Sequence, residues 1–170
     1  KTIQRELADN LRAKIINGGN TFDGLIGYDN TVIPDFERAI LSGHNINLLG
    51  LRGQAKTKLA RKMTSLLDEW IPVVSGSEIN EDPLKPISKF TKELIAEKGD
   101  NTPITWMHRN ERFFEKLSTP DVTVADLIGD VDPIKAATLK LTYADEKVLH
   151  FGMIPRAHRC IFAVSYTHLR

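Results

Sequence analysis

Three things are scarce in this sequence, and each scarcity excludes a class of protein. Cys160 is the only cysteine, which rules out a disulfide within the chain and a zinc site built from several cysteines. No segment approaches the roughly 18 consecutive apolar residues of a membrane-spanning helix, so no membrane span is expected. The 23 basic residues barely outnumber the 22 acidic ones. This balance argues against a protein that binds nucleic acid through bulk positive charge.

The composition that remains is that of a globular protein. Hydrophobic residues make up 41% and charged residues 26% of the 170 residues, unlike the composition of a disordered chain. A chain of this length is expected to form one hydrophobic core. It starts with Lys1 and carries no apolar signal segment near its beginning. We therefore expect a fragment of a cytoplasmic protein.

Hydrophobic spacing predicts alternating helices and strands. Apolar residues four positions apart predict an amphipathic helix over residues 3–16. Further helices are expected over 34–41, 56–70, 87–95 and, as a short one, 110–117. Short apolar runs predict strands over 46–49, 71–74, 104–107 and 161–164. Because strands separated by helices favour right-handed crossovers, we expect an α/β fold with a parallel central sheet covered on both faces.

A glycine-containing segment between an expected strand and an expected helix carries the chemistry. A phosphate-binding loop needs glycines, so that backbone N–H groups can surround the phosphates, followed by a lysine and a hydroxyl residue. Gly50, Lys56 and Thr57 stand at the required positions, and Gly53 adds flexibility, but Ala55 replaces the second motif glycine. An ordinary turn before a helix, with a solvated lysine and threonine, is the alternative.

The expected roles within this segment follow from phosphate chemistry. Lys56 is the expected catalytic residue, because its charge neutralises the γ-phosphate, and Thr57 is the expected Mg²⁺ ligand. Arg52 either touches phosphate or is simply an exposed loop arginine. The expected nucleotide-binding residues of the segment are Gly50, Leu51, Arg52, Gly53, Gln54, Ala55, Lys56, Thr57 and Lys58.

Several motifs in chain order resemble one family. The segment 50–57 resembles the AAA+ form of the Walker A motif, G-x-x-G-x-G-K-T. The segment 24–28 resembles the AAA+ lead-in, in which an apolar residue and a glycine, here Ile26 and Gly27, contact adenine. Segments 125–133 and 152–163 are similar to the magnesium-chelatase ATPase subunit and its MoxR-type relatives. The resemblance spans about residues 20–164.

The resemblance implies a three-layer P-loop NTPase fold of the AAA+ type, incomplete at its C-terminus. It implies binding of ATP and Mg²⁺, and ATP hydrolysis that remodels or loads a partner protein. Family members form ring homo-oligomers and work with partners that carry a von Willebrand factor A domain; nothing in the sequence selects magnesium insertion into porphyrin. The expected organisation is an N-terminal helix over 1–19, a partial nucleotide-binding domain over 20–164 and a foreign tail over 165–170.

The sequence departs from the family where hydrolysis would be completed. The Walker B strand should continue into an acidic pair, but Val164 is followed by Ser-Tyr-Thr-His-Leu-Arg. We therefore expect this chain to hydrolyse ATP poorly, with the sensors, arginine finger and lid beyond residue 170. Two alternatives stay open: a non-hydrolysing nucleotide-binding or assembly module, and an α/β scaffold without ligand, for which Ala55 is the main support.

Other chemistry-bearing residues have structural explanations. Asp126, Asp130 and Asp132 lack the spacing of a twelve-residue calcium loop, and aspartates beside glycine and proline are typical of turns and caps. Cys160 precedes an apolar run and is expected to be buried rather than nucleophilic. Both tryptophans, at positions 70 and 106, fall in apolar patterns and are expected in the core.

Overall fold

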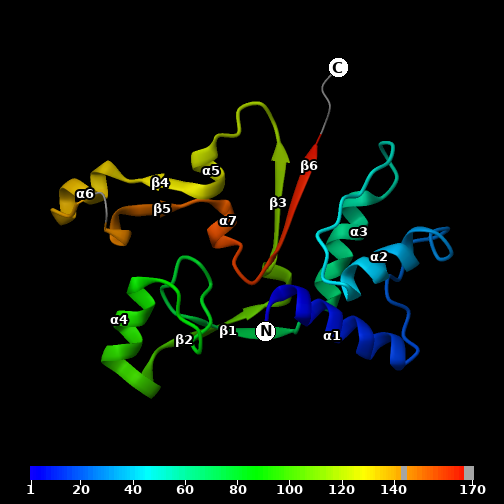
Figure 1. The fold of residues 1–170 in the computed structure, drawn as a ribbon, viewed down its shortest axis with the longest axis horizontal. Coiled ribbons are helices and arrows are strands. Elements are labelled where there is room, and N and C mark those ends of the chain that lie inside the picture. Colours follow the sequence, from blue (N-terminus) through cyan, green and yellow to red (C-terminus); the bar gives the residue numbers. More distant parts are fainter. Residues whose placement is uncertain (143–144, 167–170) are drawn as a thin grey trace. The chain divides into compact units, whose positions relative to one another are not determined.

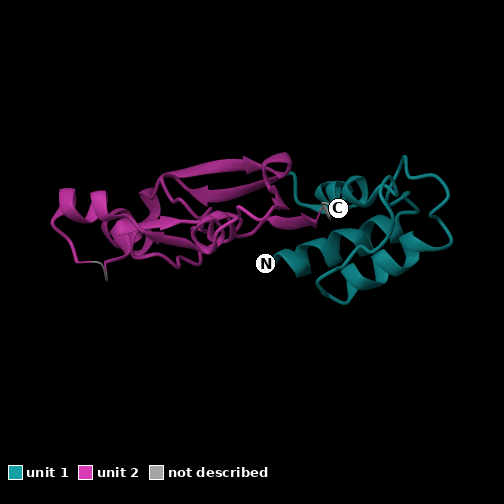
Figure 2. Cartoon of the chain, turned by 90° about the horizontal axis from the view of Figure 1, so that it is seen from above, with its two compact units in different colours: residues 1–69 teal, residues 70–170 magenta. Residues whose placement is uncertain are grey.

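The computed structural model describes residues 1–142 and 145–166 (Figure 1). The chain forms two units, residues 1–69 and 70–170 (Figure 2). The helix expected within residues 1–19 belongs to the first unit. Among the described residues, no helix has the length and apolar character that crossing a membrane would require.

Unit 1 is built from helices. They are α1 (Ile3–Ile16), α2 (Val32–Leu41), α3 (Lys56–Lys62) and the 3₁₀ helix η1 (Met63–Leu66). The expected first helix is confirmed, and the Thr2 side chain caps it by accepting a hydrogen bond from the Arg5 N–H. The core of the unit includes Leu11, Phe22 and Phe36, and the two phenylalanine rings meet edge to face at 5.3 Å.

Two expectations for unit 1 are wrong. Residues 46–49 form no strand, since every residue of unit 1 is described and none belongs to a strand with which the run could pair. The helix that starts at Lys56 does not reach residue 70. Thr64 and Ser65 donate their hydroxyls to carbonyls three residues earlier, and such side-chain bonds favour the tighter 3₁₀ turn in which the helix ends.

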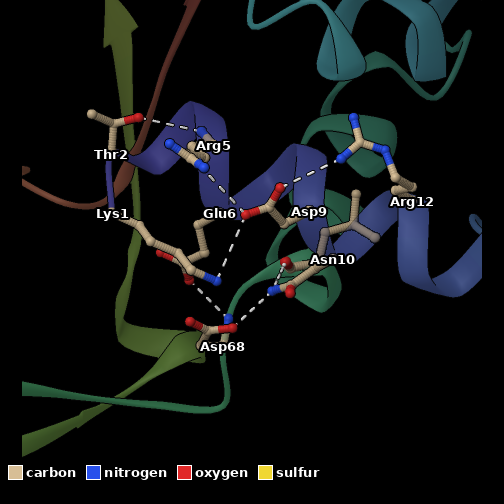
Figure 3. A network of polar contacts seen from close by, with 9 residues as sticks. Lys1, Thr2, Arg5, Glu6, Asp9, Asn10, Arg12 and Asp68 are labelled. Carbon is tan, nitrogen blue, oxygen red and sulfur yellow. Dashed lines mark hydrogen bonds and ion pairs between the residues drawn. The ribbon is translucent and has the colours of Figure 1, made fainter.

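A polar network joins α1 to the segment that follows η1 (Figure 3). The buried Glu6 accepts a hydrogen bond from the Asp68 backbone N–H at 2.8 Å. Asn10 donates to the Leu66 carbonyl and to an Asp68 carboxylate oxygen, both at 2.9 Å. Asp9 lies on the more exposed side and pairs with three basic side chains, which contribute little in solvent. The network therefore fixes where the α3–η1 segment ends.

Unit 2 is a mixed α/β structure with three two-stranded sheets among its described residues. The antiparallel pairs are β1 (Trp70–Val74) with β2 (Ile104–His108), and β4 (Gly129–Val131) with β5 (Leu149–Phe151). The parallel pair is β3 (Phe113–Ser118) with β6 (Ile161–Tyr166). The α-helices are α4 (Lys89–Lys98), α5 (Val124–Ile128), α6 (Pro133–Leu139) and α7 (Met153–Arg156), and the 3₁₀ helices are η2 (Gly99–Asn101), η3 (Arg109–Glu111) and η4 (Glu146–Val148).

Three expected strands are confirmed in unit 2, over 71–74, 104–107 and 161–164, and the helix expected over 87–95 is found as α4. The expected single parallel sheet is not formed by the described residues, because parallel pairing is confined to β3 and β6. The β1–β2 pair is antiparallel because the connecting segment returns to the end where it left, as the hydrogen bond from Ser75 N–H to the Pro103 carbonyl shows. The short helix expected over 110–117 is also wrong, because most of that stretch is β3.

Burial differs between the two faces of the β1–β2 pair and along each face. Ile71 and Val73 point to one side and are nearly fully buried. Trp70 and Trp106 belong to the opposite face, which is covered at Val74 but not at the tryptophans, and their exposed fractions of 52% and 57% show that the expected core placement is wrong. A hydrophobic strand residue is buried only when its face of the sheet is covered, which composition cannot reveal.

The most deeply buried carboxylate of unit 2 anchors the segment before α4. Glu81 is fully buried and accepts hydrogen bonds from the side chains of Ser77, Ser88 and Thr91 and from two backbone N–H groups. Burial raises the pKa of Glu81, but the hydrogen bonds, led by those from Ser88 and Thr91, outweigh burial and hold this pKa at about 2. Glu81 is therefore a structural anion.

Candidate functional site

The lysine of the glycine-containing loop is held against the start of that loop. Lys56 is the first residue of α3, and its Nζ donates to the carbonyl oxygens of Gly50 at 2.9 Å and Leu51 at 2.6 Å. The side chain thus closes residues 50–56 into a ring. Because an ammonium has three donors and these two contacts use two of them, one N–H is left for an anion in the same loop.

The residue that departs from the motif adopts a backbone conformation that favours glycine. Ala55 has φ 51° and ψ 20°, in the left-handed region, and it precedes α3 without a side-chain cap. Glycine adopts this region without the steric cost that a Cβ adds. Ala55 therefore has the left-handed backbone that glycine, the motif residue at this position, would adopt without strain.

The opening glycine lies directly against the Gln54 side chain. Gly50 has φ 155°, and a Cβ built on it would overlap the Gln54 Oε1 atom. That same oxygen accepts a hydrogen bond from the Leu51 N–H at 2.9 Å. The Gln54 side chain therefore lies inside the loop, against the Gly50 backbone. Nothing in the sequence pattern indicates this placement, because the motif allows any residue at that position.

A cavity of about 480 Å³ adjoins the loop, within the size range of small-molecule sites. Its walls come from α2, from the irregular segment 45–49 and from the loop itself, including Gln54, Ala55 and Lys56. Most of the other lining side chains are apolar, with Leu25 and Phe36 among them. The cavity thus combines an apolar wall with a cationic end at Lys56.

The segment that resembles the AAA+ lead-in lies beside the loop. The Tyr28 hydroxyl donates to the Gln54 carbonyl at 3.3 Å, and Lys58 Nζ donates to the Gly24 carbonyl at 2.8 Å. Within unit 1, Leu25 and Tyr28 line the cavity, whereas the two residues expected to contact adenine do not. Ile26 is 93% exposed, and Gly27 is an exposed turn residue with φ 85°.

The remaining expected binding residues lie at the surface of the loop. Leu51, Arg52 and Gly53 are exposed at its tip. Thr57 is exposed in the first turn of α3, next to Lys56. The structure thus brings residues 50–58 together in one loop-to-helix segment and leaves the expected Mg²⁺ ligand open to solvent.

The acidic residues downstream serve as caps. Asp126 forms a reciprocal capping box with Thr123 at the start of α5, and Asp132 caps α6. The hydrogen bonds from Thr123 lower the pKa of Asp126. Across residues 1–142 and 145–166, no cluster of three metal-ligating side chains occurs. The expected turn and cap roles are confirmed for these two aspartates.

A buried polar cluster in unit 2 has no counterpart in the sequence analysis. Arg112 is fully buried and donates through Nε and Nη2 to the Arg159 carbonyl, at 3.1 and 2.7 Å. Cys160 is buried beside it, as expected, and burial raises the pKa of its thiol to about 11. A thiol with this pKa stays protonated at neutral pH, so Cys160 is not an activated nucleophile.

Comparisons with protein-family models, with curated proteins and with solved structures find no match to this chain. The family assignment therefore stays a prediction.

Proposed function

We propose that unit 1 binds ATP with Mg²⁺ through the loop 50–57, as the nucleotide-binding part of a P-loop ATPase of the AAA+ type. The observation that carries the proposal is the position of Lys56. Its ammonium is fixed by two carbonyls of its own loop and lies in the wall of a cavity large enough for a nucleotide. A solvated lysine at an ordinary helix start would have neither contact.

The lining of the cavity suits the two parts of a nucleotide. Lys56 offers positive charge, and the glycine-containing loop offers backbone N–H groups, which bind phosphate oxygens. The lining also includes Leu25, Tyr28 and Phe36, whose apolar and aromatic surfaces favour a flat ring such as a purine. This division supports a nucleoside triphosphate over a bare anion.

The proposed chemistry is positioning and charge neutralisation. Lys56 would hold the β and γ phosphates and stabilise charge that develops on the γ-phosphate, and the Thr57 hydroxyl would complete the Mg²⁺ shell. Strand β6 carries no carboxylate, so we propose that this chain binds ATP much better than it hydrolyses it. Ring assembly and remodelling of a partner protein with a von Willebrand factor A domain are further proposals that rest on the family resemblance.

The test is calorimetric titration of Mg²⁺-ATP into the wild-type chain, Lys56→Ala and the matched control Lys62→Ala. Lys62 is the last residue of the same helix. Because charge-assisted hydrogen bonds contribute about 1.5–3 kcal/mol, Lys56→Ala should weaken binding by about ten- to a hundredfold, whereas Lys62→Ala should leave it unchanged.

The same samples should be assayed for ATP turnover. Binding without turnover supports the non-hydrolysing alternative for this chain. Equal binding by folded wild type and Lys56→Ala would contradict the proposed role of the loop. A folded wild type that binds no ATP would favour a scaffold domain without ligand.

A further inference from the structure

The Gln54 side chain occupies space and a hydrogen-bond donor that a phosphate group needs. Its Oε1 accepts the Leu51 N–H at 2.9 Å and lies so close to the Gly50 backbone that a Cβ on Gly50 would overlap it. Gln54 also lines the cavity beside Lys56. The side chain therefore folds back into the ring that Lys56 closes, and it remains exposed to solvent there.

An amide oxygen is a chemical substitute for a phosphate oxygen in this position. Both accept hydrogen bonds from backbone N–H groups, and phosphate-binding loops use such N–H groups as their donors. With Gln54 folded inward, the Leu51 N–H is already paired within the chain. A phosphate that approached this donor would meet the carboxamide.

We propose that the inward-folded Gln54 side chain, here called the stopper, blocks the loop 50–57 and must swing out before phosphates bind. This inference rests on the proposed function of the loop. It makes the inward conformation a competitor of the ligand, so the apparent affinity is reduced by the fraction of molecules whose loop is open. The Tyr28 hydroxyl bonds the Gln54 backbone carbonyl rather than its side chain, so the side chain can leave while the backbone stays anchored.

The decisive experiment measures binding of two probes, Mg²⁺-ATP and inorganic tripolyphosphate, to wild type and Gln54→Ala. A net intramolecular hydrogen bond of ordinary strength corresponds to about a two- to tenfold change in an equilibrium constant. Gln54→Ala should therefore bind ATP about two- to tenfold more tightly, with the same gain for tripolyphosphate, because the stopper competes with phosphate and not with the base.

Three further variants sharpen the measurement. Gln54→Glu keeps an acceptor for the Leu51 N–H and adds negative charge, so it should weaken binding of both probes. Gln4→Ala changes the only other glutamine of the chain, which is exposed on α1, and should leave both affinities at the wild-type value. Should Gln54→Ala fail to fold, Gln54→Ser removes the same contact, since its side chain is too short to fold back onto Leu51.

The outcomes separate this inference from the proposed function. If wild type and Gln54→Ala bind both probes equally, the stopper is refuted while the proposed function stands. A gain with ATP but none with tripolyphosphate refutes the stopper too, because it places Gln54 at the base. If neither folded protein binds either probe, the proposed function itself is refuted.

Discussion

Replacing Ala55 with glycine tests the conformation on which the candidate site depends. Ala55 has φ 51° immediately before α3, and no side-chain group caps the helix at this position. If this left-handed turn is present, glycine should be the better residue. The substitution restores the residue that the Walker A pattern has at position 55, and it removes only one methyl group.

Two effects favour glycine at position 55, and one opposes it. A left-handed backbone costs a residue with a Cβ about 1–2 kcal/mol. Against this, glycine destabilises the folded state by about 0.4–1 kcal/mol, because it has more conformational freedom in the unfolded chain. Glycine is also a better residue than alanine before the first helical turn, by about 0.5 kcal/mol. Ala55→Gly should therefore raise the free energy of unfolding by about 1 kcal/mol.

The assay is urea unfolding followed by circular dichroism, with Ala60→Gly as the matched control. Ala60 lies within α3, where the backbone is right-handed and glycine costs about 1 kcal/mol. The same substitution should thus have opposite signs five residues apart. Mg²⁺-ATP affinity should change less than about threefold in Ala55→Gly, because the loop already has the required turn and gains little preorganisation.

Equal destabilisation by Ala55→Gly and Ala60→Gly would refute the reasoning, because it would mean that residue 55 is not left-handed. A large gain in ATP affinity without a gain in stability would also contradict it. That result would mean that alanine holds the loop in a different conformation from the one described.

Three other predictions concern the anchors of the two units and the cavity. The pKa of Glu81 in the folded state is about 2, below its ordinary value of 4.5. The ionised carboxylate therefore stabilises the fold above pH 4.5, and this stabilisation is lost as the pH falls toward 2. In urea unfolding, Glu81→Gln should thus cost about 3 kcal/mol near pH 7 and much less near pH 3, and a cost independent of pH would contradict this. Asn10→Ala removes two hydrogen bonds to residues 66 and 68 and should lower the free energy of unfolding by about 1–3 kcal/mol, against no change for the exposed Gln4→Ala. Tyr28→Ala removes a cavity wall and the hydrogen bond to the Gln54 carbonyl, so it should weaken binding of Mg²⁺-ATP more than binding of tripolyphosphate in calorimetry; equal weakening of both would place Tyr28 at the phosphates.

The features that could be predicted from the sequence are those that depend on nearby residues. The helix over 3–16 follows from apolar side chains four residues apart, and its cap and its end lie within a few positions of it. The roles of Asp126 and Asp132 follow in the same way, because a cap bonds to backbone only two or three residues away. The loop itself could be located because Gly50 and Lys56 stand at a fixed spacing.

The features that could not be predicted depend on pairing between distant segments. The run 46–49 has the apolar character of a strand but no partner in unit 1, whereas 113–118 contains the helix formers Glu115, Lys116 and Leu117 and still forms a strand because β6 pairs with it. Gln54 belongs to the same class, since a motif position that accepts any residue gives no indication that its side chain folds back onto the loop. In this candidate site the motif residues predict the ligand, and we propose that the variable residue between them sets how readily the loop opens.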